Sequence, residues 1–506
     1  MSKVRTNALV VNAAASGGGG GLTFDFVLSE NITAGNIVQL LSNGKIEKIT
    51  SSVIAEALPT GNTNYTFKNS APSYLSIAYD PFNADKFVVI WKDGTDNYGK
   101  AIAGTIAGTV VTFGSIYVFL SNTAASMSIA FDLFTQNRFV ISYNNASNWY
   151  VCAGTVTGTV LTFGANSLLQ SGAIDSIYTI ADSFANGVFY SVCRRNSDGY
   201  GMFGRITMGS GTTISAVTAG FFYTGNTNLP CIVADSKVQN RLLISYIDTG
   251  GGSYPYVFAG TNGTSSINFG TRILVESNTA AGSTQVCQVN KLDNTFVVSY
   301  TNGAYGLIKA SVLTLAGTVI TAGAIQTIFT GSNQFMVMRA DKNIEGKILF
   351  VFMDSVGGAR ASALVGTVSG NTITTGTKSS FRIGASVYYI DCAFDIQGSK
   401  PGKFTIVYYD YFGGWYNSVA MVGQVGTTVS NLTATRLIGV LKETGTTNES
   451  KPVSLMGGVD TNRLGLTVNS LYYVQCDGSV STSNLTGSVL LGRAITSSAI
   501  LTKQNF

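Results

Sequence analysis

The sequence predicts an all-β protein built mainly from repeated four-stranded units, and three observations lead to this prediction. The first is a phrase that recurs roughly every 50 residues: an apolar strand, an Asp or Asn turn, a second strand and a Gly-Thr hairpin. The second is the chemistry of the second strands, such as 87–91 (FVVIW) and 138–143 (RFVISY), which are rich in β-branched and aromatic residues. The third is that no stretch keeps a helical period, while only seven prolines interrupt the chain.

Seven copies of the repeat can be aligned by their first strands. These strands fall near Ser76, Ser128, Ile177, Cys231, Val286, Met336 and Ile390. A unit that cannot bury its own face must stack on its neighbours, and a spacing of about 50 residues is that of a propeller blade. Radial closure leaves only short, protected strand edges, so we expect a seven-bladed β-propeller over 65–450. An array of two-sheet sandwiches is the alternative architecture.

The two ends of the chain have a different rhythm from the repeats. Each end contains a strand, a tight turn and a return strand, with Asn43-Gly44 at the front turn and Asp477-Gly478 at the back turn. Chain termini commonly lie close together. We therefore expect a small β-barrel made from 22–64 and 451–506, with the propeller inserted between its halves.

Short motifs at both ends carry a resemblance to a known class of proteins. The back end contains Gly465-Leu466-Thr467, 471–474 (LYYV), Asp477-Gly478 and 491–496 (LGRAIT); the front contains 34–38 (AGNIV) and Asn43-Gly44-Lys45. The back motifs resemble a small β-domain that recurs in bacteriophage tail-fibre and other virion structural proteins. The front motif is similar to a strand-and-turn pattern of phage decoration and fibre proteins. The resemblance leaves the repeats out, implies a structural role in a virion, and brings no catalytic residues with it.

The composition argues against several classes of function. The chain has no histidine, which removes the commonest general base, the Ser-His and Cys-His pairs and the usual transition-metal ligands. Charged residues make up 11% of the sequence, and the net charge of +5 is spread without a basic run, so nucleic-acid binding is not expected. No pair of carboxylates stands out, and 196–199 is only a fragment of a sialidase Asp-box. We expect no enzyme, cofactor or metal; a two-carboxylate glycan hydrolase is the enzymatic alternative.

The cysteines suggest where the chain folds. The cysteines are Cys152, Cys193, Cys231, Cys287, Cys392 and Cys476. Five of them fall in predicted propeller strands, which predicts small buried side chains with free thiols, as in a reducing cytoplasm.

Residues 1–21 are expected to form a flexible arm that docks on a neighbouring subunit. The apolar run at 7–16 is short and polar for a secretory signal, and the glycines at 17–21 form a linker. Secretion by this segment is the alternative. No stretch approaches 18 uninterrupted apolar residues, so we expect no membrane span.

The turns between second and third strands are polar and aromatic, a combination that suits sugars because rings stack on a pyranose while amides and carboxylates bind its hydroxyls. The candidate ligand-binding residues are Asp93, Tyr98, Trp149, Tyr150, Tyr200, Tyr254, Tyr305 and Trp415. The same residue types are also what tight turns require, so turn chemistry alone, or protein contact, is the alternative. A Ca²⁺ site at Asp93 and Asp96 is not favoured, because each loop has too few carboxylates.

Together these features predict a non-enzymatic bacteriophage virion protein: a tail fibre, head fibre or capsid decoration appendage. We expect it to fold in the host cytoplasm and then to occupy the particle surface. Its partners would be other virion proteins, further copies of itself and a host surface glycan, so that many weak contacts act together. A secreted carbohydrate-binding propeller lectin is the alternative.

Overall fold

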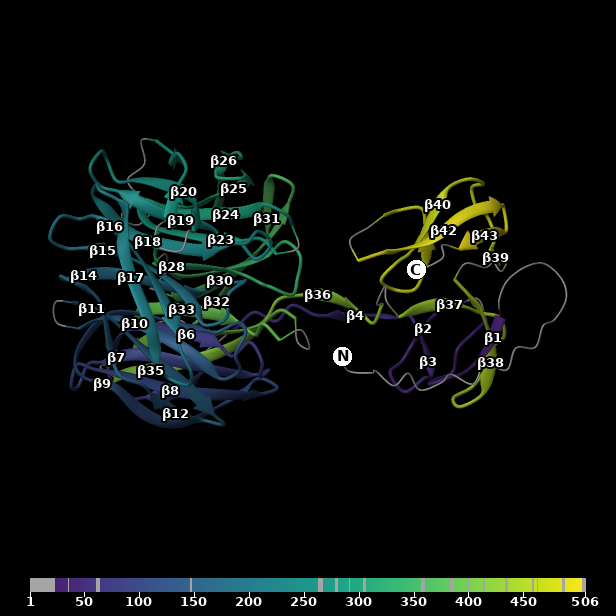
Figure 1. The fold of residues 1–506 in the computed structure, drawn as a ribbon, viewed down its shortest axis with the longest axis horizontal. Helices are drawn as coiled ribbons and strands as arrows, with labels where there is room; N and C mark the ends of the chain where they lie inside the picture. Colours follow the sequence, from purple (N-terminus) through teal and green to yellow (C-terminus); the bar gives the residue numbers. More distant parts are fainter. Residues whose placement is uncertain are drawn as a thin grey trace. The chain divides into compact units, whose positions relative to one another are not determined.

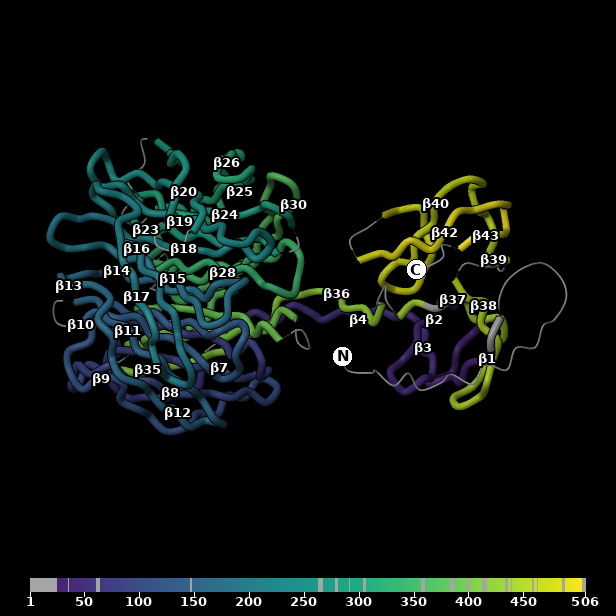
Figure 2. The backbone as a smooth tube through the Cα atoms, viewed as in Figure 1, coloured from purple at the N-terminus to yellow at the C-terminus, as the bar shows by residue number. Residues whose placement is uncertain are grey.

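The computed structural model describes residues 23–502 except for gaps at 35, 61–63, 146–147, 263–266, 278–280, 291, 304–305, 356–359, 383–385, 398–400, 413–414, 433–435, 457–458, 462 and 485–486. All regular structure in the described residues is β-strand (Figure 1). The chain divides into a large unit, Ala55–Val425, and a small unit made from the described parts of Met1–Ile54 and Gly426–Phe506. Figure 2 shows that the small unit combines the purple start of the chain with its yellow end.

The large unit consists of antiparallel sheets whose strands follow one another along the chain, as the repeats predict. Its first sheet spans two repeats and contains β6 (Pro72–Tyr79), β7 (Lys86–Asp93), β8 (Tyr98–Ala107), β9 (Val110–Phe131), β10 (Arg138–Asn145), β11 (Asn148–Thr157), β12 (Val160–Phe163) and β13 (Ser167–Ser171). Strand β9 is long because its first half pairs with β8 and its second half with β10. It therefore ends one repeat and begins the next.

Each later sheet corresponds to one repeat. The third repeat forms β14 (Ile174–Ala181), β15 (Val188–Arg195), β16 (Gly201–Met208) and β17 (Ile214–Tyr223). The fourth forms β18 (Thr227–Ala234), β19 (Arg241–Asp248), β20 (Tyr254–Asn262), β21 (Ile267–Phe269) and β22 (Ile273–Leu274). The fifth forms β23 (Ala281–Gln288), β24 (Thr295–Asn302), β25 (Ile308–Ala316), β26 (Val319–Ala322) and β27 (Gln326–Phe329).

The last two sheets follow the same plan, and the final one closes the series. The first of them contains β28 (Asn333–Ala340), β29 (Lys347–Asp354), β30 (Arg360–Ser369), β31 (Thr372–Thr375) and β32 (Ser379–Phe381). The second contains β33 (Ser386–Phe394), β34 (Lys403–Phe412) and β35 (Trp415–Gln424), and takes its outer strand, β5 (Tyr65–Lys68), from the start of the unit. The first strands β6, β9, β14, β18, β23, β28 and β33 each contact the next, and β33 contacts β6, so they form a closed ring of neighbours.

Apolar side chains fill the space between successive sheets. The cluster that joins the first and last repeats contains Phe87 and Trp91 of β7 together with Val407 and Tyr409 of β34. Phe87, Trp91 and Val407 are fully buried. Burial of a side chain such as Phe or Val contributes about 1.5–3 kcal/mol. The apolar second strands are therefore covered on both faces by neighbouring sheets.

A buried aspartate explains the Asp turn of the repeating phrase. After six first strands, a carboxylate accepts a hydrogen bond from the backbone N–H two residues later; these residues are Asp80, Asp132, Asp182, Asp235, Asp341 and Asp395. This bond fixes the turn. Arg138 Nε also donates to Asp132 Oδ2 at 2.9 Å, and both side chains are buried. The turn and the second strand are thereby joined by a buried ion pair.

The small unit contains two sheets built from both ends of the chain. One is ordered β1 (Thr23–Val27), β38 (Ser450–Leu455), β37 (Leu437–Leu441), β2 (Ile37–Leu40) and β3 (Ile46–Lys48). The other is ordered β39 (Val459–Asp460), β43 (Ala499–Thr502), β42 (Val489–Thr496), β40 (Leu471–Val474) and β41 (Val480–Ser481). A separate pair joins β4 (Ser51–Ile54) to β36 (Thr427–Ser430).

The boundaries expected from the sequence need correction at both junctions. Residues 426–450 were expected in the propeller, but β37 and β38 pair with β2 and β1 and so belong to the small unit. Of the described residues, 55–60 and Asn64 belong to the large unit. The expected hairpins are present, since Gly44 and Gly478 have φ of 81° and 82° in turns between paired strands. The arm expected at 1–21 lies outside the described residues.

The cysteines are free, and five of the six are buried, as predicted. Burial raises the pKa of Cys152 to about 12 and that of Cys231 to about 11, because the thiolate loses its hydration. Cys476 is the one with partial exposure. No helix among the described residues has the length and hydrophobicity needed to cross a membrane.

Replacing Asp132 with Ala should lower the free energy of unfolding by about 3–5 kcal/mol, because it leaves the Arg138 guanidinium buried without its carboxylate. Denaturant unfolding followed by tryptophan fluorescence measures this, since Trp91, Trp149 and Trp415 all lie in the large unit. The matched control is Asp175→Ala, which breaks the exposed pair with Arg194 and should cost at most about 1 kcal/mol. Equal losses in the two variants would contradict a structural role for the buried pair.

Thiol titration should distinguish buried from accessible cysteines. At pH 8 a disulfide-exchange reagent is expected to modify at most one thiol per native chain, Cys476, and all six after denaturation. Rapid modification of two or more thiols in the native protein would show that the sheets do not bury these side chains.

Candidate functional site

The first strands of the ring share an irregularity near the start of the segment that pairs with the second strand. Every one of them carries a β-bulge, and the first residue left unpaired is Tyr74, Ser126, Ser176, Leu229, Gly282, Phe335 or Tyr389. All of these except Gly282 have a positive φ, between 36° and 55°. A bulge redirects the strand and turns the unpaired side chain to a new direction. The repeats therefore bring these seven positions to one end of the ring.

Three large rings at this position lie in consecutive repeats. Tyr389 of β33 contacts both Tyr74 of β6 and Phe335 of β28, with ring centroids 5.8 Å apart in each pair. Tyr74 is 39% exposed and Phe335 38% exposed. Elsewhere in the ring the same position holds Ser126, Ser176, Gly282 or Leu229, and Leu229 and Gly282 also border the cavity described next. A cavity of about 450 Å³ lies here, which we call the mouth pocket.

The mouth pocket combines these rings with uncharged polar groups. Its lining includes Thr284 and Asn333, both 1% exposed. Among the described residues, Thr284 Oγ1 and Asn333 Oδ1 have no hydrogen-bond partner. Of the described residues that line the cavity, none carries a charge. The mouth pocket is thus an aromatic, neutral site with unused hydrogen-bonding capacity.

A single arginine connects the first strands below the mouth pocket. Arg339 of β28 donates from Nη2 to Asp391 Oδ1 of β33 at 2.7 Å and from Nη1 to Gln285 Oε1 of β23 at 3.0 Å. Its guanidinium also lies 5.2 Å from the ring centroid of Tyr178 in β14. Asp391 Oδ2 accepts a bond from the backbone N–H of Ile77 in β6 at 3.1 Å. The hydrogen bonds link strands from four repeats, and the contact with Tyr178 adds a fifth.

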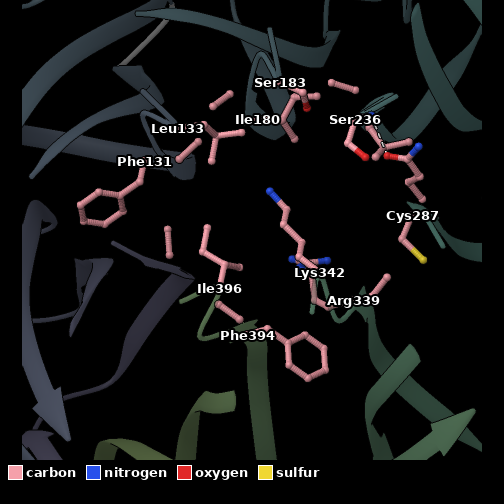
Figure 3. Close-up of a pocket in the computed structure, with 18 of the residues that line it drawn as sticks. Phe131, Leu133, Ile180, Ser183, Ser236, Cys287, Arg339, Lys342, Phe394 and Ile396 are labelled. Carbon is pink, nitrogen blue, oxygen red and sulfur yellow. Dashed lines mark hydrogen bonds between the residues drawn. The ribbon is translucent and has the colours of Figure 1, made fainter. Parts of the chain in front are cut away.

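A second cavity, of about 250 Å³, lies toward the other end of the first strands, and we call it the channel (Figure 3). Its walls include Phe131, Ile180, Phe394 and Ile396, and the ammonium of Lys342 projects toward its middle. No described carboxylate forms an ion pair with Lys342. The pKa of Lys342 lies below its usual value because the surrounding protein displaces bulk water, although the side chain is exposed within the channel.

Two of the loop residues predicted to bind a ligand are buried, which corrects the prediction for them. Asp93 accepts a bond from Lys100 Nζ at 2.7 Å, and although burial opposes ionisation, this bond and that from Thr95 lower the pKa of Asp93 to about 2. Trp149 is fully buried between two sheets, and its Nε1 donates to Ser142 Oγ at 2.7 Å. Both side chains turned inward because β7 and β11 extend further than the sequence suggested.

The other predicted residues remain half-buried in separate repeats. These are Tyr98, Tyr150, Tyr200 and Tyr254. Tyr150 stacks on Tyr143, and Tyr200 contacts Phe221. Among the described residues, no ring contact brings two of the predicted tyrosines together. Tyr305 lies outside the described residues, and so does the side chain of Trp415, whose backbone belongs to β35.

Sequence reasoning missed the mouth pocket because its residues lie in strands rather than loops. The signal was present, since aligning the repeats places Tyr74, Phe335 and Tyr389 in one column with Ser126 and Ser176. In that column the aromatic residues belong to the sixth, seventh and first repeats, which are neighbours in the closed ring. In the part of the chain that the structure describes, no group of three or more Cys, Asp or Glu side chains gathers to hold a metal.

Comparison with known proteins gives the fold class. No family model and no curated protein sequence matches the chain. Among solved structures, the BP39L lectin from Burkholderia pseudomallei aligns with a TM-score of 0.50 at 12% identity, over 72% of this chain and 98% of the lectin. Sqt1 from Chaetomium thermophilum, bound to the N-terminus of ribosomal protein L10, gives 0.44 at 10% identity over 72% and 98%. The NanB sialidase from Streptococcus pneumoniae gives 0.42 at 10% identity over 73% and 71%.

At these identities the likeness to the lectin concerns the fold alone. The chain is an all-β protein of propeller-like architecture. The functions of the similar proteins differ from one another, so the function of this chain must be argued from its own residues.

Replacing Arg339 with Met should destabilise the large unit by about 3 kcal/mol or more, because Asp391 is then buried without its partner. Adding Asp391→Asn to the same chain should restore part of this loss, since it removes the unpaired charge. Both are measured by denaturant unfolding with tryptophan fluorescence. The single variant Asp391→Asn is measured as well. If the double variant loses as much stability as the two single variants added together, the two residues do not interact.

Proposed function

We propose that the protein is a non-enzymatic presentation module, in which a seven-bladed β-propeller is carried by a small β-barrel built from both chain ends. The repeat count and the ring of first strands support seven blades, with β5 completing the last. The antiparallel sheet of β1, β38, β37 and β2, whose strands come from both chain ends, supports a small unit made from both ends. In this role the propeller supplies a rigid surface and the small unit supplies attachment.

The observation that carries this proposal is how the large unit is closed. Backbone bonds join Ala57 and Gln424 in both directions, each at 2.9 Å, so the segments that enter and leave the large unit run side by side. Strand β5 then pairs with β35, which ties the beginning of the repeats to their end. A ring closed in this way can be held at one place without opening, which is what an appendage requires.

We place this module on a bacteriophage particle, as a tail fibre, head fibre or capsid decoration. The motifs at 465–467, 477–478 and 491–496 support this placement, because they resemble those of virion β-domains. The small unit would bind other virion proteins, and repeated copies would multiply weak contacts of the propeller with other subunits or with a host surface.

A secreted propeller lectin is the second candidate function. The observation that favours it is the mouth pocket, an uncharged aromatic cavity that is sized for a small ligand. This candidate differs from the first in location rather than in architecture.

Electron microscopy with an antibody against the large unit tests the placement. Particles purified from cells that produce the protein should carry label on their outer surface, and denatured particles should release the chain with an N-terminus at Met1 or Ser2. Recovery of the protein only as free chains in the medium, cleaved near Ala15, would contradict the virion placement and favour the lectin.

A further inference from the structure

We infer that the mouth pocket binds an uncharged sugar ring. The inference depends on the ring of first strands and on the side chains at its end. It does not depend on whether the protein belongs to a particle. The proposed binding site lies at one end of the ring of first strands, on the axis of that ring, and not in the loops between second and third strands.

The aromatic rings argue for a ligand with an apolar face. Tyr74, Phe335 and Tyr389 lie side by side, partly exposed, at the edge of the cavity. The C–H face of a pyranose stacks on such rings, while its hydroxyls point away. The three rings come from consecutive repeats, so they form one continuous platform rather than separate contacts.

The backbone at these positions supports a role beyond packing. Tyr74, Phe335 and Tyr389 have φ of 54°, 51° and 48°, where bulky residues are rarely found. A bulge alone is satisfied by a small residue, such as Ser126, Ser176 or Gly282 in other repeats. Leu229, with φ of 44°, is a fourth bulky residue at this position, and it borders the same cavity. Aromatic residues retained in a strained conformation point to a ligand, because such strain gathers at binding sites.

The polar groups specify a hydroxyl-bearing partner. Thr284 Oγ1 can donate or accept, and Asn333 Oδ1 can only accept. Both atoms have almost no accessible surface and no partner in the described residues, so a sugar hydroxyl in the cavity satisfies each of them once the side chain turns toward it. An apolar peptide side chain would stack on the rings but would leave these two atoms unpaired.

The absence of charge in the described lining decides between neutral and acidic sugars. A carboxylate buried there would lose its hydration without gaining a cation. Arg339 of β28 does not line the mouth pocket, and its guanidinium is bound by Asp391 and Gln285. We therefore expect neutral pyranoses to bind and uronic or sialic acids to be rejected.

Titration of the full chain with methyl glycosides tests the inference. The neutral probes are those of glucose, galactose, mannose, fucose, xylose and N-acetylglucosamine; the acidic probes are those of glucuronic and N-acetylneuraminic acid. Isothermal calorimetry or ligand-observed NMR should give saturable binding to at least one neutral probe and at least about tenfold weaker binding to the acidic ones.

Three variants locate the site. Phe335→Leu removes a ring, and Thr284→Val removes a hydroxyl at nearly constant shape; each should weaken binding about tenfold while leaving the unfolding midpoint close to wild type. Tyr200→Ala, in a loop of another repeat, is the matched control and should leave binding unchanged. The inference is overturned if no neutral probe binds, if acidic probes or a phenylalanine amide bind better, or if only Tyr200→Ala weakens binding.

Discussion

The closure of the ring by β5 and β35 is the interaction on which the rest of the large unit depends. Each repeat has apolar residues on both faces, so every sheet needs a neighbour on either side. The first and last sheets obtain theirs only from each other, through the cluster of Phe87, Trp91, Val407 and Tyr409. Without closure these side chains would face water and the outer strands would present open edges. Closure thus fixes the number of repeats as well as their stability.

Closure also creates the sites on the axis. Residues that are far apart in sequence, such as Tyr74 and Phe335, border one cavity only because the ring brings the first and sixth repeats near each other. The strain at the bulges, about 1–3 kcal/mol for each bulky residue, is held in place by the surrounding sheets. Arg339 contributes by connecting Asp391, Gln285 and Tyr178 across the ring. The neutral mouth pocket and the cationic channel are therefore separate environments within one ring.

Much of the fold could be predicted because its signals are local. The first strands expected near Ser76 and Ile390 are β6 and β33, and the predicted burial of five cysteines is confirmed. The junction at 426–450 was wrong because pairing of β37 with β2 joins distant segments and leaves no local pattern. The loop prediction failed for Asp93 and Trp149, whose residue types suit a ligand as well as an ion pair or a core. The mouth pocket escaped because it depends on comparing one column across all repeats.

Hydrogen–deuterium exchange with and without a saturating neutral glycoside tests most directly whether function lies on the axis. We expect slower exchange in peptides that cover the starts of β6, β28 and β33, around Tyr74, Phe335 and Tyr389. Peptides over the loops at 92–99 and 195–201 should exchange at unchanged rates. Protection confined to those loops, or no protection anywhere, would contradict an axial binding site.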